Sequence, residues 1–214
     1  MKADMVYGNT STEPSEGLLT VAQALAYLLM LHPRRKMGQL QLVQLLWAAD
    51  RRHIRHYGGT ISESDYIATI NGPASILALA IVEQNSHILT PNDIAYLCQF
   101  FTCDNRDIAL SADMGDDCLS DLAKDMLSAT YNLLGDKSAI ELGRLSRRYP
   151  EWIRFRALFA SGNCTPRTID KPDFFRNPTR DKYFAEDDEI LHGAREIFLE
   201  DCELLTAVND PGGV

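Results

Sequence analysis

Residues 45–59 read LLWAADRRHIRHYGG and form the second half of a predicted helix that begins near Gly38 and stops at Tyr57. Two glycines follow this helix directly, which is typical of a helix C-terminus. At helical spacing the sequence places a single stripe along the helix. Its members are Val43, Leu46, Trp47, Asp50, Ile54 and Tyr57. A stripe that is apolar apart from one carboxylate predicts a face packed into the protein core.

Asp50 and His53 are the polar residues on or beside this stripe. Because they are three positions apart, their side chains can touch on one helix face. One interpretation is a histidine held by a carboxylate, acting as a general base or, together with His56, as a metal ligand. The other is a partly buried hydrogen bond that fixes packing. We expect the second, so Trp47, Asp50, His53 and Tyr57 are predicted to be structural.

Arginines form two further groups in the sequence. Arg51, Arg52 and Arg55 are assigned to the opposite face of the same helix, where they either solvate it or hold phosphates or an acidic protein surface. A second basic stretch surrounds Trp152. Its arginines are Arg144, Arg147, Arg148, Arg154 and Arg156. Arginine beside tryptophan is typical of the centre of an interface, although Trp152 fits a plain core position as well.

The rest of the sequence predicts a mainly α protein, a single helical domain with a small β-hairpin or short strands. Further helices are predicted over residues 20–31, 73–84, 119–134, 138–145 and 150–159, and after residue 186. Thr20 is the expected N-cap of the first of these. Asn71-Gly72-Pro73 is expected to be a turn that leads into a helix with proline in its first turn. Asp104-Asn105 is a candidate hairpin turn.

The domain is expected to span residues 18–205, between a flexible leader at 1–17 and a flexible tail at 206–214. Residues 161–184 are rich in Pro, Arg, Asn and Thr and are expected to form a long loop. Residues 62–70 fit a short extended piece or an irregular loop equally well. Residues 90–112 are ambiguous apart from the candidate hairpin.

The charges are unevenly distributed along the 214-residue chain, whose net charge is −9. Residues 113–125 hold five acids and one lysine, and residues 186–203 hold eight acids and one arginine. Residues 34–55 carry six basic residues and one acid. An acidic chain is a poor default binder of nucleic acids or anionic membranes. Separated charges of this kind suit a protein partner of complementary charge.

Common catalytic and targeting signals are missing from the sequence. It contains no Gly-rich phosphate loop, no His-Glu-x-x-His helix and no Gly-x-Ser-x-Gly motif. Its five cysteines include no Cys-x-x-Cys pair, which indicates reduced thiols and no zinc site. No apolar run approaches the roughly 18 residues of a membrane helix. We therefore expect a cytoplasmic protein without enzyme activity, cofactor or metal.

The helix motif and the turn that follows it resemble the signature of Panacea-domain proteins, the SocA-like antitoxins. In that family an aliphatic helix ends in Ala-Asp-Arg-x-His-Leu, Tyr-Gly-Arg-x-Ile follows, and a Gly-Pro-Val turn closes an extended stretch. The matching residues are 45–59, Ile61, Tyr66, Ala68 and Gly72-Pro73, and the resemblance covers residues 38–82. A weaker similarity over residues 106–152 rests on residues 138–146, SAIELGRLS. The chain departs from the family pattern at Gly59, Ala74 and Arg147, where Arg, Val and His are usual.

The resemblance implies a non-enzymatic antitoxin that neutralises a cognate protein toxin, encoded nearby, by direct contact. Family members also occur in phages and prophages. The expected contact residues are Arg51, Arg52, Arg55, Gly72, Pro73, Trp152 and Arg154. The alternative is a nucleic-acid-binding regulator that uses the basic face of residues 34–55, and a weaker one is a hydrolase centred on Asp50 and His53.

Overall fold

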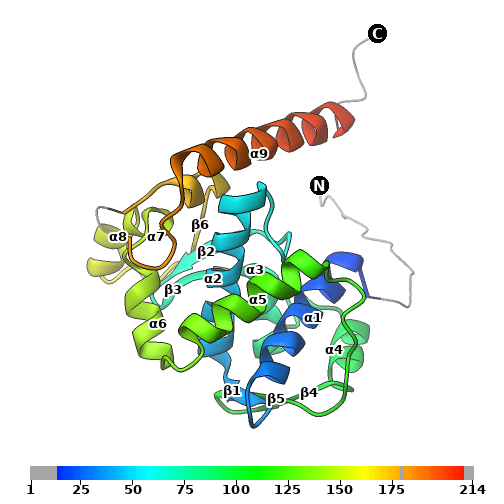
Figure 1. Ribbon diagram of the computed structural model, residues 1–214. Helices are drawn as coiled ribbons and strands as arrows, with labels where there is room; N and C mark the ends of the chain where they lie inside the picture. The colour runs from blue at the N-terminus through cyan, green and yellow to red at the C-terminus, as the bar shows by residue number, and fades with distance from the viewer. Residues whose placement is uncertain (1–13, 179–180, 210–214) are drawn as a thin grey trace, which may run out of the picture.

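The computed structural model describes residues 14–178 and 181–209 and is mainly helical (Figure 1). The N-terminal part comprises α1 (Glu16–Leu31), β1 (Lys36–Gly38), α2 (Gln39–Tyr57), β2 (Tyr66–Thr69), β3 (Gly72–Ser75), α3 (Ile76–Glu83) and α4 (Pro91–Leu97). The central part comprises β4 (Phe101–Asp104), β5 (Asp107–Leu110), α5 (Asp121–Leu134) and α6 (Ala139–Ser146). The C-terminal part comprises α7 (Pro150–Ile153), α8 (Arg156–Ala160), β6 (Arg167–Thr168), the 3-10 helix η1 (Lys171–Phe175) and α9 (Asp188–Asn209). The predicted fold class, helical with minor β structure, is confirmed.

Helix α2 is the centre of the molecule. It packs against α1, α3, α5, α6 and α9 and also against η1. The helix ends as predicted, because Gly58 adopts a left-handed conformation with φ of 82° and donates its N–H to the Ile54 carbonyl. Because other elements cover α2 on several sides, burial is not confined to one stripe. Its buried residues are Leu42, Val43, Gln44, Leu45, Leu46, Trp47, Ala48, Ala49, Asp50, Arg51, Ile54 and Arg55.

One antiparallel sheet, in the order β1-β5-β4, lies beside the start of α2. Its β4–β5 hairpin was predicted, but the turn is formed by Asn105 and Arg106, one residue later than expected, because Asp104 still pairs with Asp107. Asn105 takes a φ of 55°. Asparagine tolerates this left-handed conformation better than most residues. The remainder of the ambiguous region holds α4, which begins with a capping box between Thr90 and Asp93.

The second sheet has the order β3-β2-β6 and corrects one prediction. Pro73 does not open a helix: it lies in β3 and pairs with Ala68 of β2. The strand β3 is at the edge of the sheet, where a proline sacrifices no ladder hydrogen bond on its outer side. The helix α3 begins only at Ile76, and the side chain of its N-cap Ser75 accepts a hydrogen bond from the Ala78 N–H at 3.1 Å.

Two further helix predictions need correction. The first helix begins at Glu16 with Ser15 as its N-cap, whereas Thr20 lies inside it and donates to the Glu16 carbonyl at 3.0 Å. The helix expected over residues 150–159 is divided into α7 and α8. At the chain ends, residues 1–13 of the predicted leader and residues 210–214 of the predicted tail lie outside the described residues, and α9 extends to Asn209.

The region 161–184 is not a plain loop. It contributes β6 to the second sheet and then η1, and it buries Phe174, Phe175 and Phe184 in the core. Phe174 packs edge-on against Tyr66, with ring centroids 5.3 Å apart, and Phe184 packs in the same way against Trp47 at 5.6 Å. We call residues 171–178 and 181–184 the clamped segment, because buried side chains of α2 hold its backbone.

Candidate partner-binding surface

Asp50 connects α2 to the chain that follows it. Its carboxylate is completely buried and accepts hydrogen bonds from the Ser62 N–H at 3.0 Å, the Ser62 hydroxyl at 2.5 Å and the Tyr66 hydroxyl at 2.5 Å. Burial raises the pKa of the Asp50 carboxyl, and these hydrogen bonds oppose the rise. His53 does not hold Asp50 in place. Its Nδ1 donates instead to the Gly59 carbonyl at 2.6 Å.

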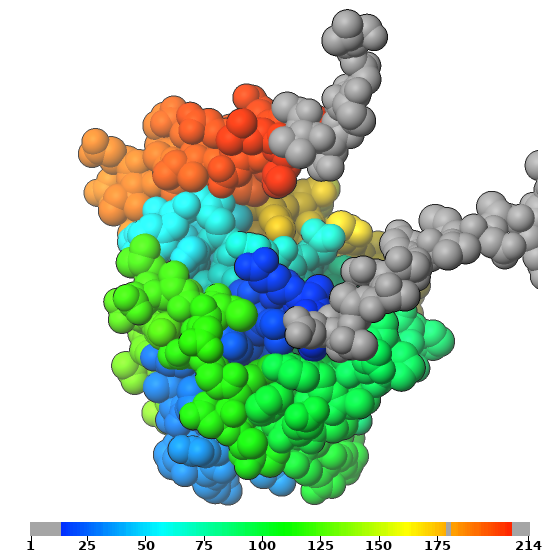
Figure 2. All heavy atoms as spheres, turned by 90° about the vertical axis from the view of Figure 1, so that its right-hand side faces the viewer, coloured from blue at the N-terminus to red at the C-terminus, as the bar shows by residue number. Residues whose placement is uncertain are grey.

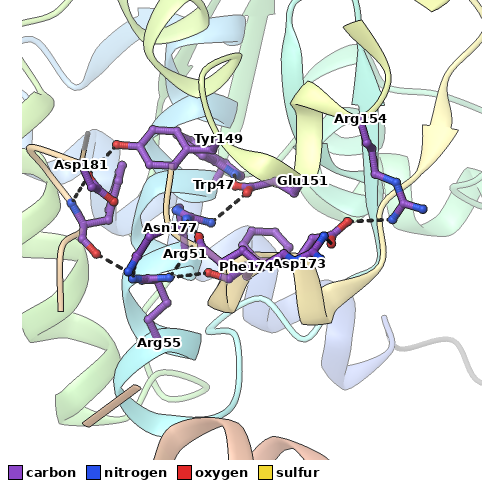
Figure 3. A network of polar contacts seen from close by, with 12 residues as sticks. Trp47, Arg51, Arg55, Tyr149, Glu151, Arg154, Asp173, Phe174, Asn177 and Asp181 are labelled. Atoms are coloured by element: carbon purple, nitrogen blue, oxygen red, sulfur yellow. Dashed lines mark hydrogen bonds and ion pairs between the residues drawn. The ribbon is translucent and has the colours of Figure 1, made fainter. Parts of the chain in front are cut away.

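Arg51 is buried, which corrects the prediction that it faces solvent. Its guanidinium forms an ion pair with the equally buried Glu151 at 2.8 Å and donates to the Arg176 carbonyl at 2.8 Å (Figure 3). It also lies 4.4 Å from the centroid of the Tyr149 ring. Burial raises the pKa of Glu151, and the positive charge of Arg51 opposes this. The pair joins α2 to α7 inside the protein.

Arg55 is also buried, with 1% of its surface exposed. It donates to the Phe174 carbonyl at 2.8 Å, to the Phe184 carbonyl at 3.1 Å and to the Asn177 side chain (Figure 3). Burial and the neighbouring Arg51 lower the pKa of Arg55 to about 10. The two arginines therefore hold the backbone of the clamped segment. Neither presents its charge to a partner, and of the predicted trio only Arg52 is partly exposed.

Gly72 and Pro73 are buried as well, so the turn does not present its backbone at the surface. Gly72 has a φ of 131°, and a Cβ atom added there would overlap the Ser146 hydroxyl of α6. The Gln44 side chain donates to the Pro73 carbonyl at 2.9 Å. The Gly-Pro pair thus allows close packing between β3, α2 and α6.

Trp152 belongs to the core and Arg154 to the surface. The Trp152 indole is 6% exposed, donates to the Thr69 carbonyl at 2.7 Å and stacks on Phe159. Arg154 is exposed and forms ion pairs with Asp170 at 2.6 Å and Asp173 at 2.7 Å. Of the two candidates in this region, only Arg154 is therefore accessible to a partner.

Arg154 lies on the wall of a surface hollow of about 680 Å³ beside α7. The lining residues are Arg148, Pro150, Ile153, Arg154, Arg156, Arg176, Asn177 and Pro178. Every charged residue among them is an arginine, and all four arginines are exposed. The arginine-rich stretch was visible in the sequence, but Arg176 was missed because it comes from the region expected to be a loop. We call this feature the arginine hollow.

The basic residues of the nucleic-acid alternative do not form one surface. Arg34 and Arg35 are exposed before β1, and Lys36 is paired with Asp107 at 3.1 Å. Arg51 and Arg55 are buried near the other end of α2, which is about 28 Å long at 1.5 Å per residue. The structure therefore divides the basic face on which that alternative depends.

Within the described residues, no group of three or more His, Cys, Asp or Glu side chains is placed to hold a metal ion. In the same part of the chain, no helix has both the length and the hydrophobicity needed to cross a bilayer.

Residues 42–153, just over half of the chain, match the family described as Antitoxin SocA-like, Panacea domain. No curated protein and no solved structure matches the chain significantly. The match begins within α2 and ends at the last residue of α7. It therefore includes Asp50, Arg51 and Glu151 but neither the clamped segment nor α9.

Proposed function

Because the chain belongs to the family of SocA-like antitoxins with a Panacea domain, we propose that it neutralises a cognate protein toxin by binding it directly. The proposed toxin is the product of an adjacent gene, in a bacterial, phage or prophage genome, and the complex forms in the cytoplasm. The proposed mode of action is stoichiometric binding and not catalysis. The geometry supports this because two polar side chains of the family motif, Asp50 and Arg51, are buried and paired within the protein.

The arginine hollow supports a position for the proposed contact. Of its four arginines, Arg154 and Arg176 are already paired with Asp170 or Asp173. The other two present planar, permanently charged groups, which bind carboxylates in a bidentate manner. Arg148 and Arg156 have no side-chain hydrogen bond or ion pair in the described part of the protein, so their charges are not neutralised by a neighbouring acid. We propose that an acidic segment of the toxin occupies the hollow.

The test is a double charge reversal, Arg148→Glu with Arg156→Glu, in cells that also express the adjacent gene. We expect the variant to fold normally, because both side chains are exposed, and to lose toxin capture and growth rescue. The matched control is Arg34→Glu with Arg106→Glu, which changes the same charge at exposed positions remote from the hollow. Equal capture and rescue by both variants would place the contact elsewhere.

A further inference from the structure

The first half of α9 is anchored to the body of the protein. Ala194 is 2% exposed, and the Ala194 carbonyl and Ile197 approach Gly58 so closely that a Cβ atom there would overlap them. Phe198 packs on Phe175 of η1, with ring centroids 5.5 Å apart. This half therefore belongs to the core that the clamped segment completes.

The second half of α9 extends beyond these contacts (Figures 1 and 2). Leu204 lies seven residues after Ile197 on the same face, and the acids Glu200 and Asp201 lie between them on that face. Leu204 is 65% exposed and Ile197 is 47% exposed. The acids around them are all exposed: Glu196, Glu200, Asp201 and Glu203. No lysine or arginine occurs between residues 196 and 209.

These features are typical of a negatively charged amphipathic helix that docks on a partner protein. Exposed apolar side chains that continue a buried stripe are a common sign of an interaction site. An amphipathic helix is recognised through such a stripe when it lies in an apolar groove. The acids beside Leu204 disfavour a second copy of this chain as the occupant, because pairing two such helices would bring like charges together.

We propose that the second half of α9, through the face that carries Leu204, inserts into an apolar groove on the toxin whose rim carries lysine and arginine side chains. This inference rests on the proposed function and adds a partner surface to it. The family match ends at residue 153, so α9 lies outside the shared domain. The helix therefore supplies the contact through which this chain selects its own toxin.

The test compares two single substitutions in the full chain, Leu204→Glu and Leu199→Glu, with the purified product of the adjacent gene as the probe. Leu199 is 45% exposed on the opposite face of α9, so it receives the same chemical change outside the proposed contact. We expect Leu204→Glu to weaken binding by about tenfold or more and Leu199→Glu to bind like the parent. Circular dichroism and thermal melting should show the same fold for all three proteins.

A charge variant supplies a second readout. Glu200→Lys should slow association with the toxin and weaken its dependence on salt, because attraction to a basic rim is lost. If the parent binds the toxin and both leucine variants bind equally well, the docking role of α9 is wrong while the proposed function stands. If the parent itself does not bind, the proposed function fails and this inference fails with it. A parent dimer that Leu204→Glu dissociates would identify a second copy as the occupant and overturn the proposal.

Discussion

Arg51 and Arg55 owe their burial to the central position of α2, which brings η1 and α9 over their side of the helix. A buried guanidinium stays charged when carboxylate and carbonyl oxygens satisfy its N–H groups. Glu151 and the backbone of the clamped segment supply these oxygens. Helical periodicity places Arg51 beside the apolar stripe, four residues after Trp47 and three before Ile54, and not opposite it. Arg55 lies further round the helix, and periodicity contains no information about what covers that face. Their exposure was therefore predicted wrongly.

Arg51→Ala should strongly destabilise the protein, because it leaves the buried Glu151 without its ion-pair partner. We expect a loss of about 3–5 kcal/mol in the free energy of unfolding, measured by urea denaturation. The control is Arg52→Ala on the same helix, a half-buried arginine whose removal should cost about 0.5 kcal/mol or less. Similar small losses in both variants would show that the ion pair does not hold α7 to α2.

Burial and hydrogen bonding have opposite effects on the pKa of Asp50, and the pH dependence of the stability of an Asp50→Asn variant should show which effect is larger. Burial raises the pKa of Asp50 above its ordinary value of 3.8, so the folded protein holds this proton more tightly than the unfolded chain. The stability that this group contributes is then complete below its ordinary pKa and is lost as the pH rises through the raised pKa. The asparagine side chain of the variant does not titrate and makes no such contribution.

The difference in unfolding free energy between the parent and Asp50→Asn should therefore be largest in acid and become smaller toward neutral pH. Denaturant titrations of both proteins over a series of pH values measure this difference. A difference that grows with pH would show the reverse balance, in which the hydrogen bonds from Ser62 and Tyr66 outweigh burial and favour the ionised carboxylate.

At the scale of the elements, the β2–β3 hairpin depends on a glycine for its packing. Gly72→Ala should lower the melting temperature clearly, because φ of 131° is unfavourable for alanine and its Cβ would overlap the Ser146 hydroxyl. Gly59→Ala is the matched control, since nothing lies within 4 Å of a Cβ atom at that position. Equal melting temperatures for both variants would contradict the close packing of β3 against α6.

Elements with local signals were predicted well. Gly58 ends α2, and Ser138 begins α6, because each acts within one turn of its helix. Pro73 was misplaced because its strand exists only through pairing with β2. The clamped segment was missed for a similar reason. Its polar composition is typical of a loop, and its three phenylalanines are buried only because the segment packs on the rest of the fold. Trp47 and Asp50 were predicted as structural from the stripe, and both lie in the core.

At the scale of the whole molecule, the chain combines the region that matches the family with a C-terminal part beyond it. The match ends at residue 153, yet the core continues through the clamped segment into the first half of α9. The basic residues predicted to gather at 34–55 are divided by the structure, and two charged surfaces of the described residues are the arginine hollow beside α7 and the acidic second half of α9. A toxin with both an acidic segment and a basic-rimmed groove would complement these two surfaces.

The central claim is neutralisation by direct binding, and the most direct measurement is affinity purification of this chain from cells that also express the adjacent gene. The account predicts that the cells grow and that the toxin elutes with the chain in a stable complex of fixed stoichiometry. Growth without a complex would contradict it, because the rescue would then act by another route such as repression of the toxin gene. Continued toxicity in the presence of the folded chain would contradict it equally.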